Sequence, residues 1–161
     1  MASGNEKPQR PSFDDFNEDE APAEVEASDE VESLESLYEY KRVLIADNST
    51  AMRKTIKNSL NELGFTDYVE AEDGHAALRE VGEDPVDLII SDWNMPKMTG
   101  LELLKVIRGH DNLKEIPFLM ITSEGDYSKI TEAVKVGVSQ YIVKPFEPEQ
   151  LQEIVKQILV D

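Results

Sequence analysis

Cysteine is absent from the 161 residues of this chain. Disulfides, thiolate metal sites and a cysteine nucleophile are therefore excluded, and a reducing compartment is in keeping with that absence. No apolar run is long enough to cross a bilayer. The first residues also lack the basic start and apolar core of a secretory signal. We therefore expect a cytoplasmic protein.

Basic residues are scarce, with 16 Lys and Arg against 34 Asp and Glu and a net charge of -18. Binding to nucleic-acid phosphates requires clustered cations, so we expect no nucleic-acid partner. Anionic membrane surfaces are disfavoured for the same reason, and we expect no membrane association. Hydrophobic residues still make up 40% of the chain, which is enough for a globular core.

Residues 1–40 form a distinct acidic segment, with 13 acidic residues and two basic ones. The segment is poor in large apolar side chains, so we expect a mostly disordered N-terminal extension. Helical spacing of apolar residues within 29–40 indicates at most a short helix. Phe13 and Phe16 lie among acids, and a second interpretation is that they dock in a groove of a partner.

Residues 41–161 alternate between strand and helix patterns. Each short apolar run is followed by a stripe of apolar residues at helical spacing. Thr50 is the expected N-cap of the first helix, and Gly64 and Gly137 are expected to end two of the helices. Five such pairs predict an α/β domain with a doubly wound parallel sheet. The expected strands are 43–46, 68–71, 86–91, 117–121 and 141–143.

Four of these strands end in polar residues: Asp47-Asn48, Asp92, Thr122 and Lys144. The carboxyl ends of parallel strands meet at one edge of the sheet, where ligands bind in open α/β folds. Two carboxylates and an amide oxygen suit a Mg²⁺ ion that keeps several waters. A hydroxyl and an ammonium group stabilise charge on a tetrahedral anion. The pattern predicts that Asp92 is a nucleophile toward a phosphoryl group.

Several strings of the sequence, in order and at domain-wide spacing, match a known family. They are Ala71-Glu72-Asp73-Gly74, Asp92-Trp93-Asn94-Met95-Pro96, Thr99-Gly100-Leu101-Glu102-Leu103-Leu104, Met120-Ile121-Thr122 and Tyr141-Ile142-Val143-Lys144-Pro145-Phe146. Over residues 41–161 the chain resembles the receiver domains of bacterial two-component response regulators, closest to stand-alone chemotaxis proteins of the CheY type. The resemblance implies a flavodoxin-like, five-stranded sheet of order 2-1-3-4-5.

The resemblance also implies roles around a metal ion. Asp92 accepts phosphate from the phosphohistidine of a histidine kinase. Asp47, Asn48, Asp92 and the backbone carbonyl of Asn94 form the expected Mg²⁺ site. The family usually has an acid where this chain has Asn48. An amide oxygen coordinates without adding charge, so we expect weaker Mg²⁺ binding than in an Asn48→Asp variant.

Further residues are implied to respond to phosphorylation. Lys144 pairs first with the acids and then with the phosphoryl group, and its bond to Pro145 is expected to be cis, as in the family. Thr122 binds the phosphoryl oxygen, and Tyr141 acts as a switch that remodels the face of the fourth helix, fifth strand and fifth helix. The implied partners are the kinase, a downstream protein target such as a flagellar switch, and a phosphatase.

Other functions remain open at this point. A phosphorelay intermediate or a phosphate sink would use the same architecture, although Asn94 and Glu124 flank the site as in chemotaxis receivers. An Asp-nucleophile phosphohydrolase would usually carry an acid two residues after the nucleophile, where this chain has Asn94, so we expect no turnover enzyme. Taken alone, Asp92 would be a loop cap and Lys144 a surface ion-pair residue. His75 is expected to face solvent and is assigned no role.

Overall fold

A computed structural model describes residues 37–123 and 127–160. The expected disordered extension, most of the short helix expected before residue 40, and Glu124 lie outside the described residues. Residues 37–39 form a single helical turn, and Tyr38 stacks on Phe65 with ring centroids 4.7 Å apart. In the described part of the chain, no helix has the length and apolarity needed to span a membrane.

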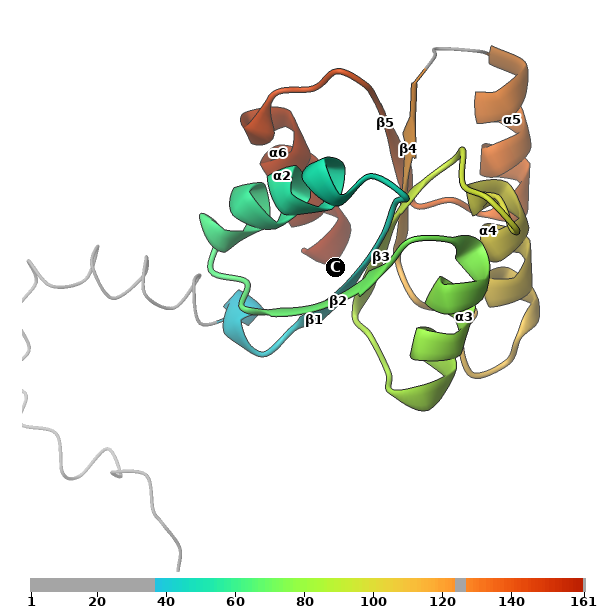
Figure 1. Cartoon of the computed structure of the whole chain (residues 1–161), viewed down its shortest axis with the longest axis horizontal. Helices are drawn as coiled ribbons and strands as arrows, with labels where there is room; N and C mark the ends of the chain where they lie inside the picture. Colours follow the sequence, from blue (N-terminus) through green and yellow to red (C-terminus); the bar gives the residue numbers. More distant parts are fainter. Residues whose placement is uncertain (1–36, 124–126, 161) are drawn as a thin grey trace, which may run out of the picture. The chain divides into compact units, whose positions relative to one another are not determined.

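Strands and helices alternate throughout the domain (Figure 1). The five strands form one parallel sheet in the order β2-β1-β3-β4-β5, which confirms the fold expected from the sequence. The elements are β1 (Arg42–Ala46), α2 (Thr50–Asn61), β2 (Asp67–Ala71), α3 (Gly74–Glu83), β3 (Leu88–Asp92), α4 (Gly100–Gly109), β4 (Phe118–Thr122), α5 (Tyr127–Val136), β5 (Gln140–Val143) and α6 (Pro148–Leu159).

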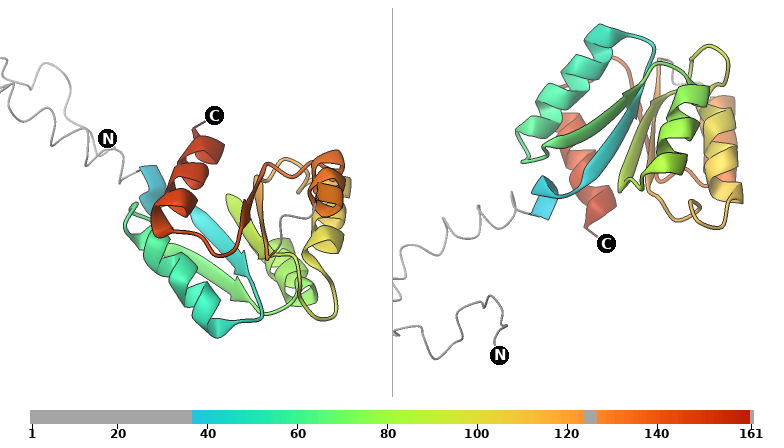
Figure 2. Two further views of the ribbon diagram at one scale, coloured as in Figure 1. Left: turned by 90° about the horizontal axis from the view of Figure 1, so that it is seen from above. Right: turned by 60° about the horizontal axis from the view of Figure 1, so that its bottom comes forward.

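The helices cover both faces of the sheet (Figures 1 and 2). Helices α2 and α6 pack together on one face, and α3, α4 and α5 follow one another on the other. Strand β1 contributes Val43 and Ile45 to the core on the α2–α6 face, and Leu44 and Ala46 to the core on the opposite face. Both faces are buried, which explains why the central strands read as continuous apolar runs.

The first helix begins differently from the expectation. Ser49, rather than Thr50, is its N-cap: the Ser49 backbone is extended and its hydroxyl accepts the Met52 N–H at 3.1 Å. Thr50 is already the first helical residue. Either side chain has the chemistry of a cap, so the sequence offered two neighbouring candidates and the backbone conformation selected Ser49.

The two expected helix-ending glycines are confirmed. Gly64 has a φ of 108° and Gly137 a φ of 109°, a region that glycine enters without steric cost. The Gly64 N–H donates to the Asn61 carbonyl and the Phe65 N–H to the Leu60 carbonyl, which is the hydrogen-bond pattern of a Schellman motif.

The third strand is shifted from its expected range of 86–91. It spans Leu88–Asp92, because its pairing with β1 starts where Leu88 lies opposite Val43. Asp87 instead turns back to β1, where its carboxylate accepts the Arg42 N–H at 2.8 Å. Asp92 is consequently the last residue of the strand and not the first residue beyond it.

Candidate functional site

Two carboxylates lie side by side at the carboxyl edge of the sheet. Ala46 is paired with Ser91 across β1 and β3, so the next residues, Asp47 and Asp92, are neighbours. Both are buried, with 1% and 6% of their surface exposed. We call Asp47 and Asp92 the carboxylate pair.

One cation faces the carboxylate pair. Lys144 follows β5, and its Nζ lies 3.5 Å from Asp47 Oδ2 and 3.5 Å from Asp92 Oδ1. The Lys144 side chain is 22% exposed, so the ammonium group approaches the pair from its solvent side. The Lys144–Pro145 bond is cis, as expected from the sequence. The structure thus brings together three of the residues singled out at the strand ends.

The environment of Asp92 disfavours its charged form. Burial raises the pKa of the Asp92 carboxyl above its ordinary value, and the charge of Asp47 raises it further. The Lys144 ammonium and the Asn94 backbone N–H lower the same pKa, but they do not offset the rise. A further cation beside Asp92 would therefore stabilise its charged form.

Asp47 is held in place through several atoms. Its Oδ1 accepts the Ser49 N–H at 2.8 Å, and its Oδ2 faces Lys144. The Asp47 N–H donates to the Ala71 carbonyl at 3.0 Å, and the Asp47 carbonyl accepts a hydrogen bond from the Arg53 guanidinium. One carboxylate oxygen is thus used by the turn that begins α2, and the other is directed at the site.

Thr122 and Tyr141 differ in how near they lie to this edge. Thr122 is the last residue of β4, is 4% exposed, and accepts the Lys144 N–H at its carbonyl at 2.8 Å. Tyr141 is the second residue of β5, opposite Met120, and is 37% exposed. Tyr141 therefore stands on the flank of the sheet, away from the strand ends.

The residues expected to hold Mg²⁺ offer two carboxylates, the amide oxygen of Asn48 and the backbone carbonyl of Asn94. Asn48 and Asn94 are both exposed on the loops that follow β1 and β3. Among the described residues, no three His, Cys, Asp or Glu side chains group closely enough to hold a metal ion. The side chain at position 48 is an amide, which offers an uncharged oxygen instead of a third carboxylate. Oxygen donors of this kind suit a hard cation that keeps part of its water shell.

Glycine at position 100 allows α4 to approach the site closely. A Cβ atom at Gly100 would collide with the Asp92 carbonyl oxygen and would lie 2.9 Å from Met120 Sδ. The Gly100 N–H donates to the Trp93 carbonyl at 2.9 Å. The first turn of α4 is therefore pressed against the backbone that carries Asp92.

Sequence reasoning missed two cations near the site. Arg53 supports the Asp47 carbonyl from the first turns of α2, and Lys129 Nζ lies 5.6 Å from the centroid of the Trp93 ring. Helix spacing offered a weak signal for Arg53, which follows Asp47 by less than two turns. No signal existed for Lys129, because α5 and the loop after β3 meet only in the folded domain.

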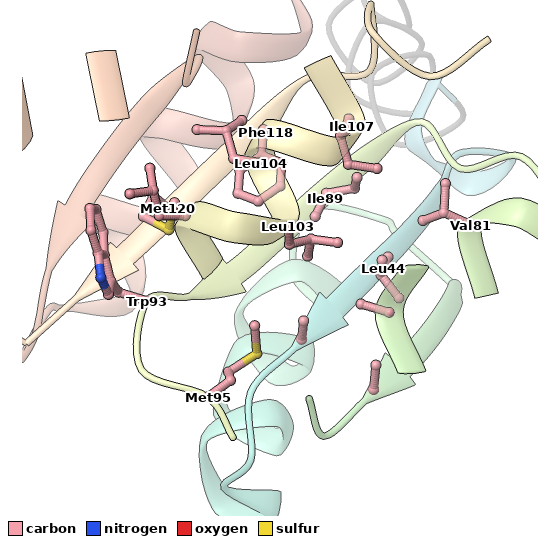
Figure 3. Packing of buried hydrophobic residues seen from close by; sticks show 14 of the residues in the cluster. Leu44, Val81, Ile89, Trp93, Met95, Leu103, Leu104, Ile107, Phe118 and Met120 are labelled. Carbon is pink, nitrogen blue, oxygen red and sulfur yellow. The ribbon is translucent and has the colours of Figure 1, made fainter. Parts of the chain in front are cut away.

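His75 is exposed, as expected. His110 is exposed as well, and Met95 is 7% exposed and packs in the core. Figure 3 shows Trp93 and Met95 on the loop that leaves β3, at the margin of the same cluster. The loop beside Asp92 is thus anchored by apolar side chains that point inward.

Comparisons with known proteins agree with this geometry. The family model described as the response regulator receiver domain matches residues 43–156. The chemotaxis protein CheY of Pseudomonas aeruginosa is 44% identical over 117 residues, which are 73% of this chain and 94% of that protein. CheY1 of Helicobacter pylori is 44% identical over 119 residues, 73% of this chain and 96% of its own length.

A solved structure gives the same result. The chemotaxis response regulator CheY4 of Vibrio cholerae superposes with a TM-score of 0.69 at 37% identity, covering 74% of this chain and 98% of its own. Fold, strand-end residues and sequence similarity therefore agree, and this chain belongs to the response regulator receiver domain family.

Proposed function

We propose that Asp92 is the phosphoacceptor of a two-component signalling protein whose surface responds to phosphorylation. The observation that carries the proposal is the contact of one ammonium group, that of Lys144, with both members of the carboxylate pair at 3.5 Å. Family membership and 44% identity to chemotaxis proteins support the signalling role. A chemotaxis or flagellar-motor role is the output that these relatives favour.

The proposed reaction is transfer of a phosphoryl group to a side-chain carboxylate. An Asp92 oxygen attacks phosphorus and forms an acyl phosphate, while the bond to the donor breaks and its electron pair leaves with the donor group. A bound Mg²⁺ ion supplies positive charge to the transferring oxygens when it is present. Lys144 contributes its ammonium, and Thr122, the last residue of β4, contributes a hydroxyl as a hydrogen-bond donor.

Several finer features belong to the same proposal. Asp47, Asn48, Asp92 and the Asn94 carbonyl hold Mg²⁺, and Thr122 and Tyr141 relay the change to the surface of α5, β5 and α6. Residues 41–161 form the receiver and residues 1–40 an extension. The partners are a histidine kinase, a downstream target and a phosphatase in the cytoplasm. The residue two places after Asp92 is Asn94, so we propose no turnover of free phosphomonoesters.

The decisive experiment uses the full chain with acetyl phosphate and Mg²⁺. Intact-mass spectrometry should show one added phosphate on the wild type and none on Asp92→Asn. The asparagine variant is a matched control, because it keeps the shape of the side chain and removes the nucleophilic carboxylate. An unmodified wild type, or a variant that still gains phosphate, would contradict the proposal.

A further inference from the structure

The loop between β3 and α4 carries a proposed metal ligand, the backbone carbonyl of Asn94. Its beginning is fixed at Trp93, whose N–H donates to the Ile121 carbonyl at 2.8 Å and whose carbonyl accepts the Gly100 N–H at 2.9 Å. The Asn94 backbone N–H bonds to the Asp92 carboxylate, but Asn94 is otherwise exposed, so the position of its carbonyl also depends on what holds the rest of the loop.

The loop reverses at Lys97 in an unfavourable conformation. Lys97 has a φ of 69°, and the Met98 N–H donates to the Pro96 carbonyl at 2.7 Å across it. A hydrogen bond that spans a single residue with positive φ defines a tight three-residue turn, which is rare and strained. A non-glycine residue in this region costs on the order of 1 kcal/mol or more and persists only where its surroundings hold it.

Two contacts with the start of α3 hold this turn. Lys97 Nζ lies 3.7 Å from Asp73 Oδ2. The Asp73 carboxylate is itself fixed, because its Oδ1 accepts the Ala76 N–H at 2.8 Å as the N-cap of α3. A Cβ atom at Gly74 would lie 2.5 Å from the Met98 carbonyl oxygen, so the two backbones touch there.

We infer that Asp73, Gly74 and Lys97 are positioning residues for the Asn94 carbonyl, and that the start of α3 acts as a brace for the metal site. The brace acts through the loop, since none of the three is one of the proposed ligands. The inference rests on the proposed function, because it takes Asn94 as a metal ligand.

Neutralising Lys97 changes the Mg²⁺ affinity in opposite directions under two explanations. A cation near a metal site repels Mg²⁺, so simple electrostatics predicts that neutralising Lys97 tightens Mg²⁺ binding. The brace predicts the opposite, because the turn loses its tether and the carbonyl is no longer held in place. Lys97→Gln removes the charge and the ion pair while keeping an unbranched side chain without asparagine's preference for positive φ, so it does not relieve the strain of the turn.

The test is a Mg²⁺ titration of the full chain followed by the fluorescence of Trp93, the only tryptophan. Lys97→Gln should bind Mg²⁺ about threefold more weakly, which lies within the range of an exposed ion pair. Lys105→Gln on α4 removes one positive charge from an exposed position and should leave the affinity at or slightly above that of the wild type. Unchanged or tighter binding by Lys97→Gln overturns the inference.

A second variant tests the brace without changing charge. In Gly74→Ala the new Cβ must displace Met98, and Mg²⁺ binding should again weaken. A variant that is folded by circular dichroism and binds Mg²⁺ like the wild type overturns the inference. A wild type with no Mg²⁺ response at all would refute the proposed metal site as well, which is a distinct result from a wild type that binds and variants that match it.

Discussion

The two edges of the sheet place their charged residues in different surroundings. At the amino edge, Arg42 lies 3.5 Å from Asp84 and 3.9 Å from Asp67, and its N–H is bound by Asp87. At the carboxyl edge, the carboxylate pair is buried beside the single ammonium of Lys144. The acids that face the Arg42 guanidinium are exposed, with 52% of the Asp67 side chain and 64% of the Asp84 side chain accessible to solvent, whereas the carboxylate pair is buried.

A second arginine, Arg108, also lies at the amino edge. Its guanidinium donates to the carbonyls of Ile116 at 2.6 Å, Gly137 at 2.8 Å and Lys114 at 3.1 Å, so it joins α4 to the segments that lead into β4 and β5. The amino edge therefore stabilises the fold. At the carboxyl edge two buried carboxylates face a single ammonium group, and a metal ion or a further cation would reduce the repulsion between them. The difference supports the proposal that the chemistry takes place at the carboxyl edge.

The largest expected effect is at the carboxyl edge. Lys144→Met leaves two buried carboxylates without their cation and should lower the free energy of unfolding by about 3 kcal/mol at neutral pH. Lys144 lowers the pKa of Asp92, so its removal raises that pKa further. Urea denaturation should show the loss shrinking as the pH falls and the carboxyls become protonated. A pH-independent loss would mean that the side chain acts by packing alone.

At the amino edge, Arg108→Met should cost about 2 kcal/mol, because three backbone carbonyls lose a charged donor. The loss should be the same from pH 5 to pH 8, since no carboxylate of the site is involved. Arg108→Lys is the matched control: it keeps the charge but cannot reproduce the fork of donors, and it should recover only part of the stability. Full recovery by lysine would show that charge, and not geometry, joins these segments.

Adding an acid at the carboxyl edge should change both the Mg²⁺ affinity and the stability without metal. Asn48→Asp should bind Mg²⁺ about tenfold more tightly, close to 1.4 kcal/mol, because a third carboxylate joins the donor set. The same variant should be less stable than the wild type when Mg²⁺ is removed, since it adds a like charge beside the carboxylate pair. Isothermal titration calorimetry measures the first effect and urea denaturation the second. Equal Mg²⁺ affinities would show that position 48 does not contact the metal.

The smallest expected effect is an increase in folding stability. The pKa of Asp92 is raised on folding, so its ionisation destabilises the domain as the pH rises through that pKa. Asp92→Asn should therefore be more stable than the wild type at neutral pH, and the advantage should vanish below the ordinary carboxyl range. Asp73→Asn is the opposite case: the Ala76 N–H lowers the pKa of Asp73, so the wild-type advantage appears above that range and is lost as the pH falls. Denaturation midpoints across pH compare the two.

Much of the fold was predictable from consecutive residues. Apolar runs marked four of the strands, the second strand had a weaker pattern interrupted by Glu70, and Gly64 and Gly137 marked helix ends, because periodicity and turn chemistry are local properties. The site was predictable for a related reason. Once the strands are parallel, residues at their carboxyl ends lie at one edge of the sheet, and the strand order implied by the family resemblance places Asp47 next to Asp92.

Other features were decided only by the tertiary structure. The choice of Ser49 as cap, the exposure of Tyr141 on the flank, and the contact of Lys129 with Trp93 have no signature in neighbouring residues. They depend on how helices and loops from distant parts of the chain pack against one another.

The sequence by itself determined which residues stand at the working edge, because strand direction places them there. Only the tertiary structure decided how that edge is charged and supported: the burial that raises the pKa of Asp92, and the approach of Asp73 and Gly74 to the loop at Lys97. Burial and the distances between loops depend on how the whole domain packs, so they cannot be read from any local stretch of sequence.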